Sequence, residues 1–429
     1  MSGPLKLTLS QLTEAVAGGA VAIRAIARLE PAGGPADKVF PPTYVKEKQS
    51  TTKYAFETRK VEGRDVQTVL LDSVASQANR IEESLLDGWR RGELKFPVIS
   101  VDFSSIEALA DLEQITSLQA PHRVADAILR DSVDANGTPF RQTSVGVSCT
   151  DARPNHATAM YLHCPTALLF GVWDSTGPKG GLGAKFQRCV VSEIVGHDAV
   201  AGVKVASRID PMAIEKKAGP VFEAKVGGGE WTSIEAEAVF EKGKPKPFSR
   251  KGGGGDKGTP ATINHGNIPP SIDHDAGGVT MSHAVHTVVI SLAGLRRLRF
   301  QRRADGSVIP AQERDGVEVA ARTALAALAL AGVVYQRRNG YDLRSRSLLV
   351  ASEPLEFELI SSDGGTPKHV VVDDVAALLR AASDAAAALG LGWDSAPFTL
   401  TPTPKLVHLV VKSRELTATG SGEDEGADQ

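Results

Sequence analysis

The feature that most constrains the fold of this chain is the order of its apolar segments. Short apolar stretches typical of buried strands occur at 21–29 and 98–103. Apolar residues recur at helical spacing through 67–92, 316–332 and 372–391. The predicted strands and helices therefore mix without the regular βαβ period of a doubly wound sheet. We predict an α+β fold.

Further elements follow from the same two periods. We predict, in chain order, a helix at 122–132, strands at 161–173 and 187–196, hairpins within 201–240, a β-rich segment at 281–300 and strands within 348–360. In the helix predicted at 67–92, Gln77 and Arg80 face away from the apolar seam. The segment 241–258 is rich in Gly, Pro and Lys, which predicts a mobile loop.

The composition is that of a globular protein with a core. Hydrophobic residues make up 42% and charged residues 23% of the 429 residues. The formal net charge is −3, so the average surface does not indicate a nucleic-acid partner. A site for a polyanion must therefore come from local basic clusters.

The cysteines and the N-terminal residues indicate a reducing compartment. Cys149, Cys164 and Cys189 are odd in number and show no C-x-x-C spacing, so we expect buried thiols and no disulfide framework. The N-terminal residues lack a basic region followed by a long apolar run, and no stretch reaches about 18 uncharged apolar residues. We expect a cytoplasmic protein with no membrane partner.

A glycine-rich basic loop, WDSTGPKGGLGAKFQR at 173–188, is the main candidate site. It fails the P-loop pattern because Ala184 precedes Lys185 and Phe186 follows it. Phe186 also occupies the position where a dinucleotide fingerprint needs its third glycine. Two interpretations stay open: a structural turn, or a loop whose Lys179, Lys185 and Arg188 contact phosphates.

Other catalytic or metal-binding patterns are weak. His283 and His286 are three residues apart, so in a strand their side chains point to opposite faces and cannot share an ion. There is no zinc-type cysteine pairing and no G-x-S-x-G motif. We therefore expect no metal and no cofactor.

Two basic clusters can each be interpreted in two ways, as a solvated surface or as a row of side chains that contact phosphates. They lie at 242–257 and at 295–303, and in a strand Arg297, Arg299 and Arg303 would share one face. Tyr44, near Lys38, could stack on a base, although aromatic residues next to prolines more often pack locally.

Several segments resemble one known family, in the same order. They are DKVFPPTY (37–44), LLDSVASQANRIEESLL (70–86), APHRVADAILRDS (120–132), ALLFGVWDSTGPKGGLGAKFQRCVVSEIVG (167–196) and LGLGWDSAPFTLTP (389–402). They are similar to the CRISPR-associated RAMP proteins of type I-G (formerly I-U) systems, which form the crRNA-binding backbone of a Cascade-type complex. The resemblance spans roughly 20–402, and 201–260 and 403–429 carry little of it.

The resemblance implies a modified ferredoxin-like (RRM-like) RAMP core with large insertions. On this basis 1–416 form a single domain, with insertions at about 104–155 and 201–280. The last residues, 417–429, form an acidic tail that we expect to be disordered.

The resemblance also implies a non-catalytic subunit that oligomerises along crRNA for target DNA recognition in antiviral defence. The implied partners are crRNA, the target DNA strand paired to it, further copies of the chain, and the large and guide-end processing or capping subunits of Cascade. Backbone proteins of this kind grip the phosphodiester chain, which leaves guide bases free to pair.

The residues expected to contact RNA come from the matching segments and the loop. They are Lys38, Tyr44, Gln77, Arg80, Arg123, Lys179, Gly180, Gly181, Gly183, Lys185 and Arg188. Two enzymatic alternatives remain. One is a RAMP endoribonuclease that processes precursor crRNA with His122 or His163 as general base, and the other is a nucleotide-dependent activity at the glycine loop.

Overall fold

The computed structural model describes residues 5–46, 48–175, 177, 183–227, 229–249 and 257–418. The chain divides into two compact units. The first comprises Met1–Val39, Phe56–Ala199 and Met281–Val407, and the second comprises Phe40–Ala55, Val200–Thr280 and His408–Gln429. Val200–Thr280 spans the insertion predicted at 201–280, and the residues of the other predicted insertion, 104–155, belong to the first unit.

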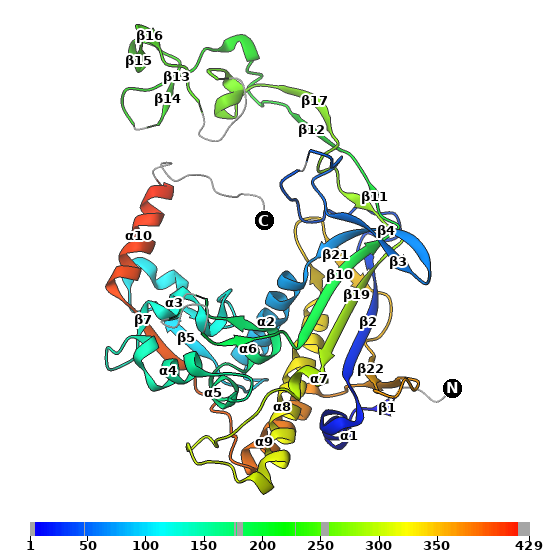
Figure 1. Cartoon of the computed structure of the whole chain (residues 1–429). Helices are drawn as coiled ribbons and strands as arrows, with labels where there is room; N and C mark the ends of the chain where they lie inside the picture. Colours follow the sequence, from blue (N-terminus) through cyan, green and yellow to red (C-terminus); the bar gives the residue numbers. More distant parts are fainter. Residues whose placement is uncertain are drawn as a thin grey trace. The chain divides into compact units, whose positions relative to one another are not determined.

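A ten-stranded sheet forms the centre of the first unit (Figure 1). Its main path is β1-β23-β22-β2-β19-β10-β4-β3, and β21 pairs with both β2 and β20 beside that path. The strands are β1 (Leu5–Lys6), β2 (Ala22–Pro31), β3 (Phe56–Val61), β4 (Arg64–Asp72), β10 (Val190–His197), β19 (His283–Ser291), β20 (Tyr341–Asp342), β21 (Leu348–Ala351), β22 (Phe357–Ile360) and β23 (Lys368–Val371).

The four central strands have the order of a ferredoxin-like fold. Along the chain, β2 is followed by helix α2 (Val74–Arg90), by β10 and β19, by helix α8 (Ala311–Asn339) and by β22. In the sheet these strands lie in the order β22-β2-β19-β10, with antiparallel neighbours. A βαββαβ chain with this strand order is the ferredoxin-like arrangement. The predicted α+β, ferredoxin-like core is therefore confirmed, and β4 and β3 extend it beyond β10.

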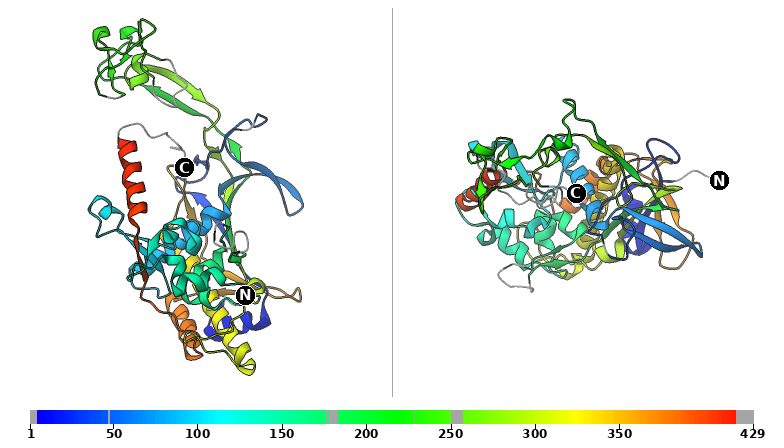
Figure 2. Two further views of the ribbon diagram at one scale, coloured as in Figure 1. Left: turned by 60° about the vertical axis from the view of Figure 1, so that its left-hand side comes forward. Right: turned by 90° about the horizontal axis from the view of Figure 1, so that it is seen from above.

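Helices α2 and α8 cover one face of the sheet (Figures 1 and 2). Helix α2 packs against β10 and α8, and α8 also packs against α9 (Val375–Ala388). Among the described residues, α8 is long and apolar enough to cross a membrane by length and composition alone. Almost all of its apolar window is buried within the structure, as in the core helix of a globular domain.

The remaining elements of the first unit surround this core. A second sheet has the order β6-β5-β24-β7, and β8 pairs with β9. The strands are β5 (Ile99–Asp102), β6 (Gln114–Thr116), β7 (Ser132–Val133), β8 (Val172–Trp173), β9 (Lys185–Phe186) and β24 (Phe398–Pro402). The helices are α1 (Leu9–Glu14), α3 (Ala127–Arg130), α4 (Ser144–Asp151), α5 (Thr158–His163), α6 (Pro165–Phe170) and α7 (Leu292–Leu295), and the last helix of the chain is α10 (Pro404–Ala418).

The second unit contains short two-stranded ladders. The pairs are β11 (Val200–Ala201) with β18 (Val279–Thr280), β12 (Lys204–Arg208) with β17 (Ile268–Asp273), β13 (Phe222–Glu223) with β14 (Trp231–Thr232), and β15 (Phe240–Glu241) with β16 (Lys244–Pro245). The β13–β14 pair is one of the predicted hairpins, whereas β12 pairs with a strand from outside 201–240. Within the predicted mobile loop at 241–258, 250–256 lie outside the described residues, as do residues 419–429 of the predicted acidic tail.

The prediction of a helix through 67–92 was wrong for its first residues. Residues 64–72 form β4, which pairs with β3 on one side and β10 on the other. Helix α2 begins after Ser73, whose hydroxyl accepts a hydrogen bond from the backbone N–H of Ser76. Leu70 and Val74 have the spacing of one helix face, but Leu70 belongs to β4 and Val74 to α2.

Three other local predictions were also wrong in part. Residues 161–173, predicted as a strand, form parts of α5 and α6 before β8, because a buried apolar run does not distinguish the two structures by period. The helix predicted at 122–132 is reduced to a 3₁₀ turn at Arg123–Ala125 and the single turn α3. Residues 297–301 form no strand, so the predicted common face of Arg297, Arg299 and Arg303 does not exist.

Two predictions about buried or alternating side chains were correct. The three cysteines are free thiols in buried positions. His286 is buried and its neighbour His283 is half-buried on the opposite face of β19. Among the described residues, no group of three His, Cys, Asp or Glu side chains could hold a metal ion.

A buried polar network joins α2 to the sheet. Asp72 at the end of β4 has no exposed surface, and its carboxylate accepts hydrogen bonds from Ser76 Oγ (2.8 Å), Gln77 Nε2 (2.6 Å) and Arg80 Nε (3.1 Å). Gln77 Oε1 accepts from Ser192 Oγ of β10 and from Gln336 Nε2 of α8, each at 3.0 Å. The network therefore fixes the position of α2 between β4, β10 and α8.

The network continues to a neutral histidine. His286 Nε2 lies 2.8 Å from Ser192 Oγ, and Nδ1 lies 3.1 Å from the hydroxyl of Tyr341. Because Ser192 donates its one hydroxyl hydrogen to Gln77, His286 must carry its hydrogen on Nε2 and accept from Tyr341 at Nδ1. Burial, the main cause, and the nearby charge of Arg337, a second one, together lower the pKa of His286 to about 3.

The first prediction concerns stability in acid. In the unfolded chain His286 binds a proton below its ordinary pKa of about 6.5, whereas in the folded chain it stays neutral down to about pH 3. Its contribution to stability is therefore present above pH 6.5 and is lost as the pH falls, by about 1.4 kcal/mol per pH unit. The variant His286→Gln lacks this titration, so its free energy of unfolding should fall less steeply between pH 6.5 and 4. Urea unfolding of both proteins across this range measures the difference, and parallel curves would contradict the assignment.

Candidate functional site

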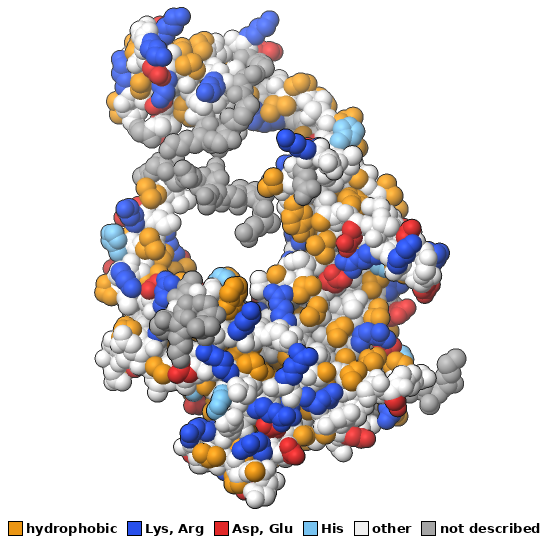
Figure 3. All heavy atoms as spheres, viewed as in Figure 1, with side chains coloured by type: hydrophobic (Ala, Val, Ile, Leu, Met, Phe, Trp, Pro, Cys, Tyr) orange, Lys and Arg blue, Asp and Glu red, His pale blue; other side chains and the backbone are white. Residues whose placement is uncertain are grey.

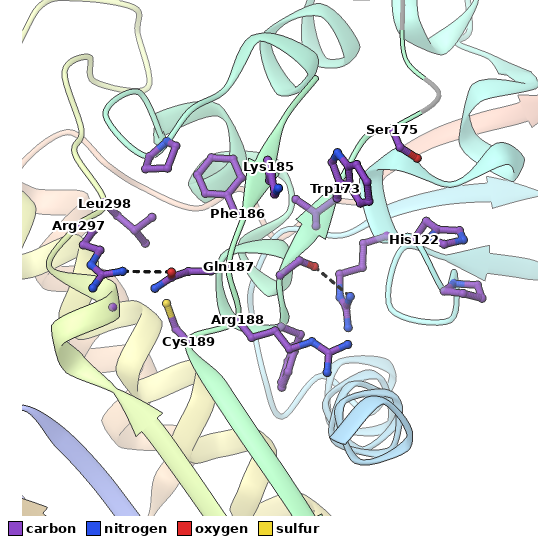
Figure 4. Close-up of a pocket in the computed structure, with 17 residues that line it drawn as sticks. His122, Trp173, Ser175, Lys185, Phe186, Gln187, Arg188, Cys189, Arg297 and Leu298 are labelled. Carbon is purple, nitrogen blue, oxygen red and sulfur yellow. Dashed lines mark hydrogen bonds between the residues drawn. The ribbon is translucent and has the colours of Figure 1, made fainter. Parts of the chain in front are cut away.

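An open groove of about 910 Å³ lies in the first unit (Figure 4). Its walls come mainly from four segments of the first unit: 121–123, 170–175, 185–189 and 294–298. Two backbone hydrogen bonds tie 185–189 to the residues just before 170–175 and 294–298. The N–H of Cys189 donates to the carbonyl of Leu169 (2.8 Å), and the N–H of Ser291 donates to the carbonyl of Cys189 (2.7 Å).

The groove carries charge of one sign. Arg123, Lys185, Arg188 and Arg297 line it together with His122, and none of its described lining residues is Asp or Glu. Figure 3 shows how Lys and Arg side chains lie among hydrophobic ones over one face of the molecule. A groove with several cations and no carboxylate concentrates anionic ligands near its walls.

A short hairpin of β8 and β9 forms one wall. Trp173 pairs with Lys185, and Val172 pairs with Phe186. Val172 and Phe186 are buried and anchor the hairpin, whereas Lys185 is exposed and Trp173 has 56% of its surface exposed. Lys185 Nζ lies 5.1 Å from the centroid of the Trp173 ring, which is a cation–π contact (Figure 4). Because side chains alternate along the two strands, the Trp173 indole and the Lys185 ammonium group project from the same side of the hairpin.

Gly171 allows the backbone before β8 to pass close to residues 186–188 after the start of β9. Its φ is +84°, and an added Cβ would lie 3.0 Å from Cγ of Arg188 and 3.1 Å from the carbonyl oxygen of Phe186. Any other residue here would be strained and crowded. Arg188 follows β9, and its side chain is exposed although its Cγ lies beside Gly171. Arg188 is one of the residues that line the groove.

A buried ion pair holds the floor of the groove. Arg123 donates from Nε (2.7 Å) and Nη2 (2.6 Å) to the two carboxylate oxygens of Glu82, and its Nη1 donates to the carbonyl of Gly171 (3.0 Å). Burial raises the pKa of Glu82 above its ordinary range, and the Arg123 guanidinium opposes this rise. Only 6% of Arg123 is exposed, so its main contacts are internal.

Asp174 follows Trp173 but does not face the groove. Arg141 donates to both of its carboxylate oxygens, at 2.7 and 2.9 Å, and the residue is buried. Its backbone N–H donates to the carbonyl of Ala184 (2.9 Å), which closes the base of the glycine loop. This pairing keeps a negative charge away from the ligand side of the hairpin.

Gly183 packs against this acidic residue. An added Cβ would lie 2.4 Å from the backbone carbonyl oxygen of Asp174, and Gly183 is itself buried. Close packing against Asp174 therefore explains glycine at this position. Lys179, Gly180 and Gly181, the other predicted contacts of the loop, lie outside the described residues.

Three of the predicted contacts line the groove: Arg123, Lys185 and Arg188. Lys185 and Arg188 line it with exposed side chains, and Arg123 lines it while its guanidinium is held inside. Lys38 is half-buried in the first unit, and Tyr44, 45% exposed, belongs to the second. Neither residue lines the groove.

Gln77 and Arg80 both make internal contacts in the structure. The expectation that Gln77 faces outward was wrong, because the residue has no exposed surface and joins Asp72 to β10 and α8. Arg80 is partly exposed, but it donates to Asp72 and to the backbone carbonyls of Asp342 and Leu343. Both side chains therefore have structural roles in this structure.

Sequence reasoning missed Trp173 as a site residue and treated Arg297 only as part of a basic cluster. Arg297 Nη1 donates to Gln187 Oε1 (3.1 Å), which ties the segment after α7 to the hairpin (Figure 4). The pairs Val-Trp and Lys-Phe on either side of the glycine loop could have indicated alternating inward and outward side chains. Of the two histidines considered as general bases, His122 lines the groove and His163 does not.

Residues 23–201 match the model of a protein family described as CRISPR-associated protein GSU0053. This match indicates a CRISPR-associated protein, and it covers less than half of the chain. The matched residues extend from β2 to β11 and include three of the four segments that form the groove. No curated protein matches the chain.

The second prediction concerns the packing of the hairpin. Replacing Gly183 with Ala forces a methyl group against the Asp174 carbonyl and should destabilise the first unit by about 1–3 kcal/mol. Gly316 is a matched control, because an added Cβ there meets nothing within 4 Å and the residue lies in helix α8. Gly316→Ala should leave stability unchanged or raise it. Urea unfolding tests both, and an unaffected Gly183→Ala protein would contradict the close packing.

Proposed function

We propose that this chain is a non-catalytic, cytoplasmic crRNA-binding subunit that oligomerises along the guide RNA as the backbone of a type I-G Cascade complex. In such a complex the guide pairs with a target DNA strand, and the large and guide-end subunits complete the assembly. The family match supports a CRISPR-associated protein, and the resemblance of the motifs supports the finer assignment. The proposal also agrees with the ferredoxin-like core.

The groove is the observation that carries the proposal. Lys185, Arg188 and Arg297 line it with exposed side chains, and no described lining residue carries negative charge. A nucleic-acid backbone is a polyanion, and such contacts bind it without reading sequence. An RNA held through its phosphates keeps its bases available for pairing with target.

A RAMP endoribonuclease is the alternative, favoured by the position of His122 on the groove wall. General base catalysis needs the histidine within hydrogen-bond reach of the attacking hydroxyl. If RNA is cleaved by the wild-type protein and remains intact with His122→Ala, the non-catalytic assignment falls.

The third prediction tests the groove by its salt dependence. The triple variant Lys185→Ala, Arg188→Ala, Arg297→Ala should weaken the binding of unrelated single-stranded RNAs about equally. Removing one ion pair with a phosphate should flatten the slope of log K against log[salt] by roughly 0.7, and removing all three should flatten it by about two units. The measurement is a salt titration of RNA affinity, with circular dichroism to show that the fold is kept.

A matched triple variant provides the control. Lys60, Arg64 and Lys405 are highly exposed basic residues of the first unit that do not line the groove. Replacing them with Ala removes the same net charge. The control variant should keep the wild-type slope, and a folded groove variant with wild-type affinity and slope would refute the RNA-binding assignment.

The fourth prediction concerns assembly. If copies bind side by side on one guide, they become effectively intramolecular neighbours, so oligomers should form on RNA at protein concentrations where free protein does not associate. Size-exclusion chromatography before and after complete RNase digestion measures this dependence. Oligomers that persist unchanged after digestion would show assembly independent of RNA.

A further inference from the structure

Trp173 is an exposed aromatic residue on the wall of the groove. Its hairpin is anchored by the buried side chains of Val172 and Phe186, on the opposite side of the two short strands. Trp173 itself keeps 56% of its surface exposed and lines the groove. The exposed part of the indole is therefore available to a ligand that occupies the groove.

The surroundings of the ring indicate what kind of partner it meets. Lys185 Nζ lies over the indole at 5.1 Å, and Arg188 and Arg297 line the same groove. Asp174, the acidic neighbour in sequence, is turned inward and paired with Arg141. A flat ring among cations matches the alternation of base and phosphate in a single nucleic-acid strand.

The central strands of the sheet offer no alternative platform for a base. RRM-type sheets stack bases on aromatic residues of their two central strands. Here those strands are β2 and β19, with sequences AIRAIARLEP and HAVHTVVIS, and neither contains Phe, Tyr or Trp. The residues of β2 and β19 that turn away from α2 and α8 include Ile26 and Thr287, which face each other across the pair.

We propose that Trp173 stacks on one unpaired base of the bound RNA, while Lys185, Arg188 and Arg297 contact phosphates of the same strand. This inference rests on the proposed function and names the substrate of the groove more closely. The site takes single-stranded RNA, because a base inside a duplex is stacked on both faces and cannot reach the ring. The base on Trp173 is held by its face and not by its pairing edge, so any base is accepted.

The experiment compares three variants on two probes. The variants are Trp173→Ala, Trp173→Phe, which keeps an aromatic ring, and Trp231→Ala, which removes the other Trp with more than 40% of its surface exposed, in the second unit. The probes are a short oligoadenylate and an abasic strand with the same sugar–phosphate backbone. Affinity is measured at several salt concentrations.

Stacking predicts a specific pattern of affinities. Trp173→Ala should bind oligoadenylate about tenfold or more weakly with an unchanged salt slope, Trp173→Phe should lose less, and Trp231→Ala should bind as wild type does. Wild type should bind the abasic strand as weakly as Trp173→Ala binds oligoadenylate. Trp173→Ala should bind the two probes with equal affinity. Tryptophan fluorescence should be quenched by oligoadenylate in wild type, and much less in Trp173→Phe.

The outcomes separate this inference from the proposed function. If Trp173→Ala binds oligoadenylate as wild type does while the groove triple variant is impaired, RNA binding stands and stacking is refuted. If Trp173→Ala weakens both probes equally, the ring only positions Lys185, and stacking is again refuted. If neither the triple variant nor Trp173→Ala is impaired, both proposals fall.

Discussion

The first unit depends on the burial of one carboxylate, that of Asp72. An ionised carboxylate inside a protein is costly unless donors surround it. Ser76, Gln77 and Arg80 supply donors from the start of α2, and Arg344 supplies a more distant one at 3.4 Å. These contacts hold the start of helix α2 in its orientation at the end of β4. That orientation places Gln77 against β10 and α8, and Glu82 beneath the groove.

The same rule explains how a chain with a net charge of −3 presents a positive groove. Glu82 and Asp174 lie behind the groove wall, and each is paired inside the protein with its own arginine. Removing either arginine would leave a buried carboxylate unpaired, which is strongly destabilising. With these carboxylates paired internally, no Asp or Glu stands among the described residues that line the groove, and net charge says little about a local site.

Sequence patterns predicted the larger elements and failed where tertiary contacts determine the local structure. Helix α8 and strands β2 and β10 have strong periods and were predicted correctly. Residues 164–172 are all buried, so their apolar pattern could not distinguish a strand from a helix. Gln77 was misplaced because a polar residue was taken to face solvent, although its partners come from β4, β10 and α8. Lys185 and Arg188 were found as part of a local basic loop, whereas Trp173 became a candidate only through its cross-strand partner.

The insertion Val200–Thr280 leaves and re-enters the first unit on neighbouring strands. Its flanking residues follow β10 and precede β19, which are antiparallel and pair as far as His197 with His283. The two ends of the insertion are thus fixed side by side by the core sheet itself. Doubling the length of a flexible segment closed in this way costs only about 0.6 kcal/mol. Evolution can therefore lengthen, shorten or replace this segment while the strand order of the core is inherited unchanged.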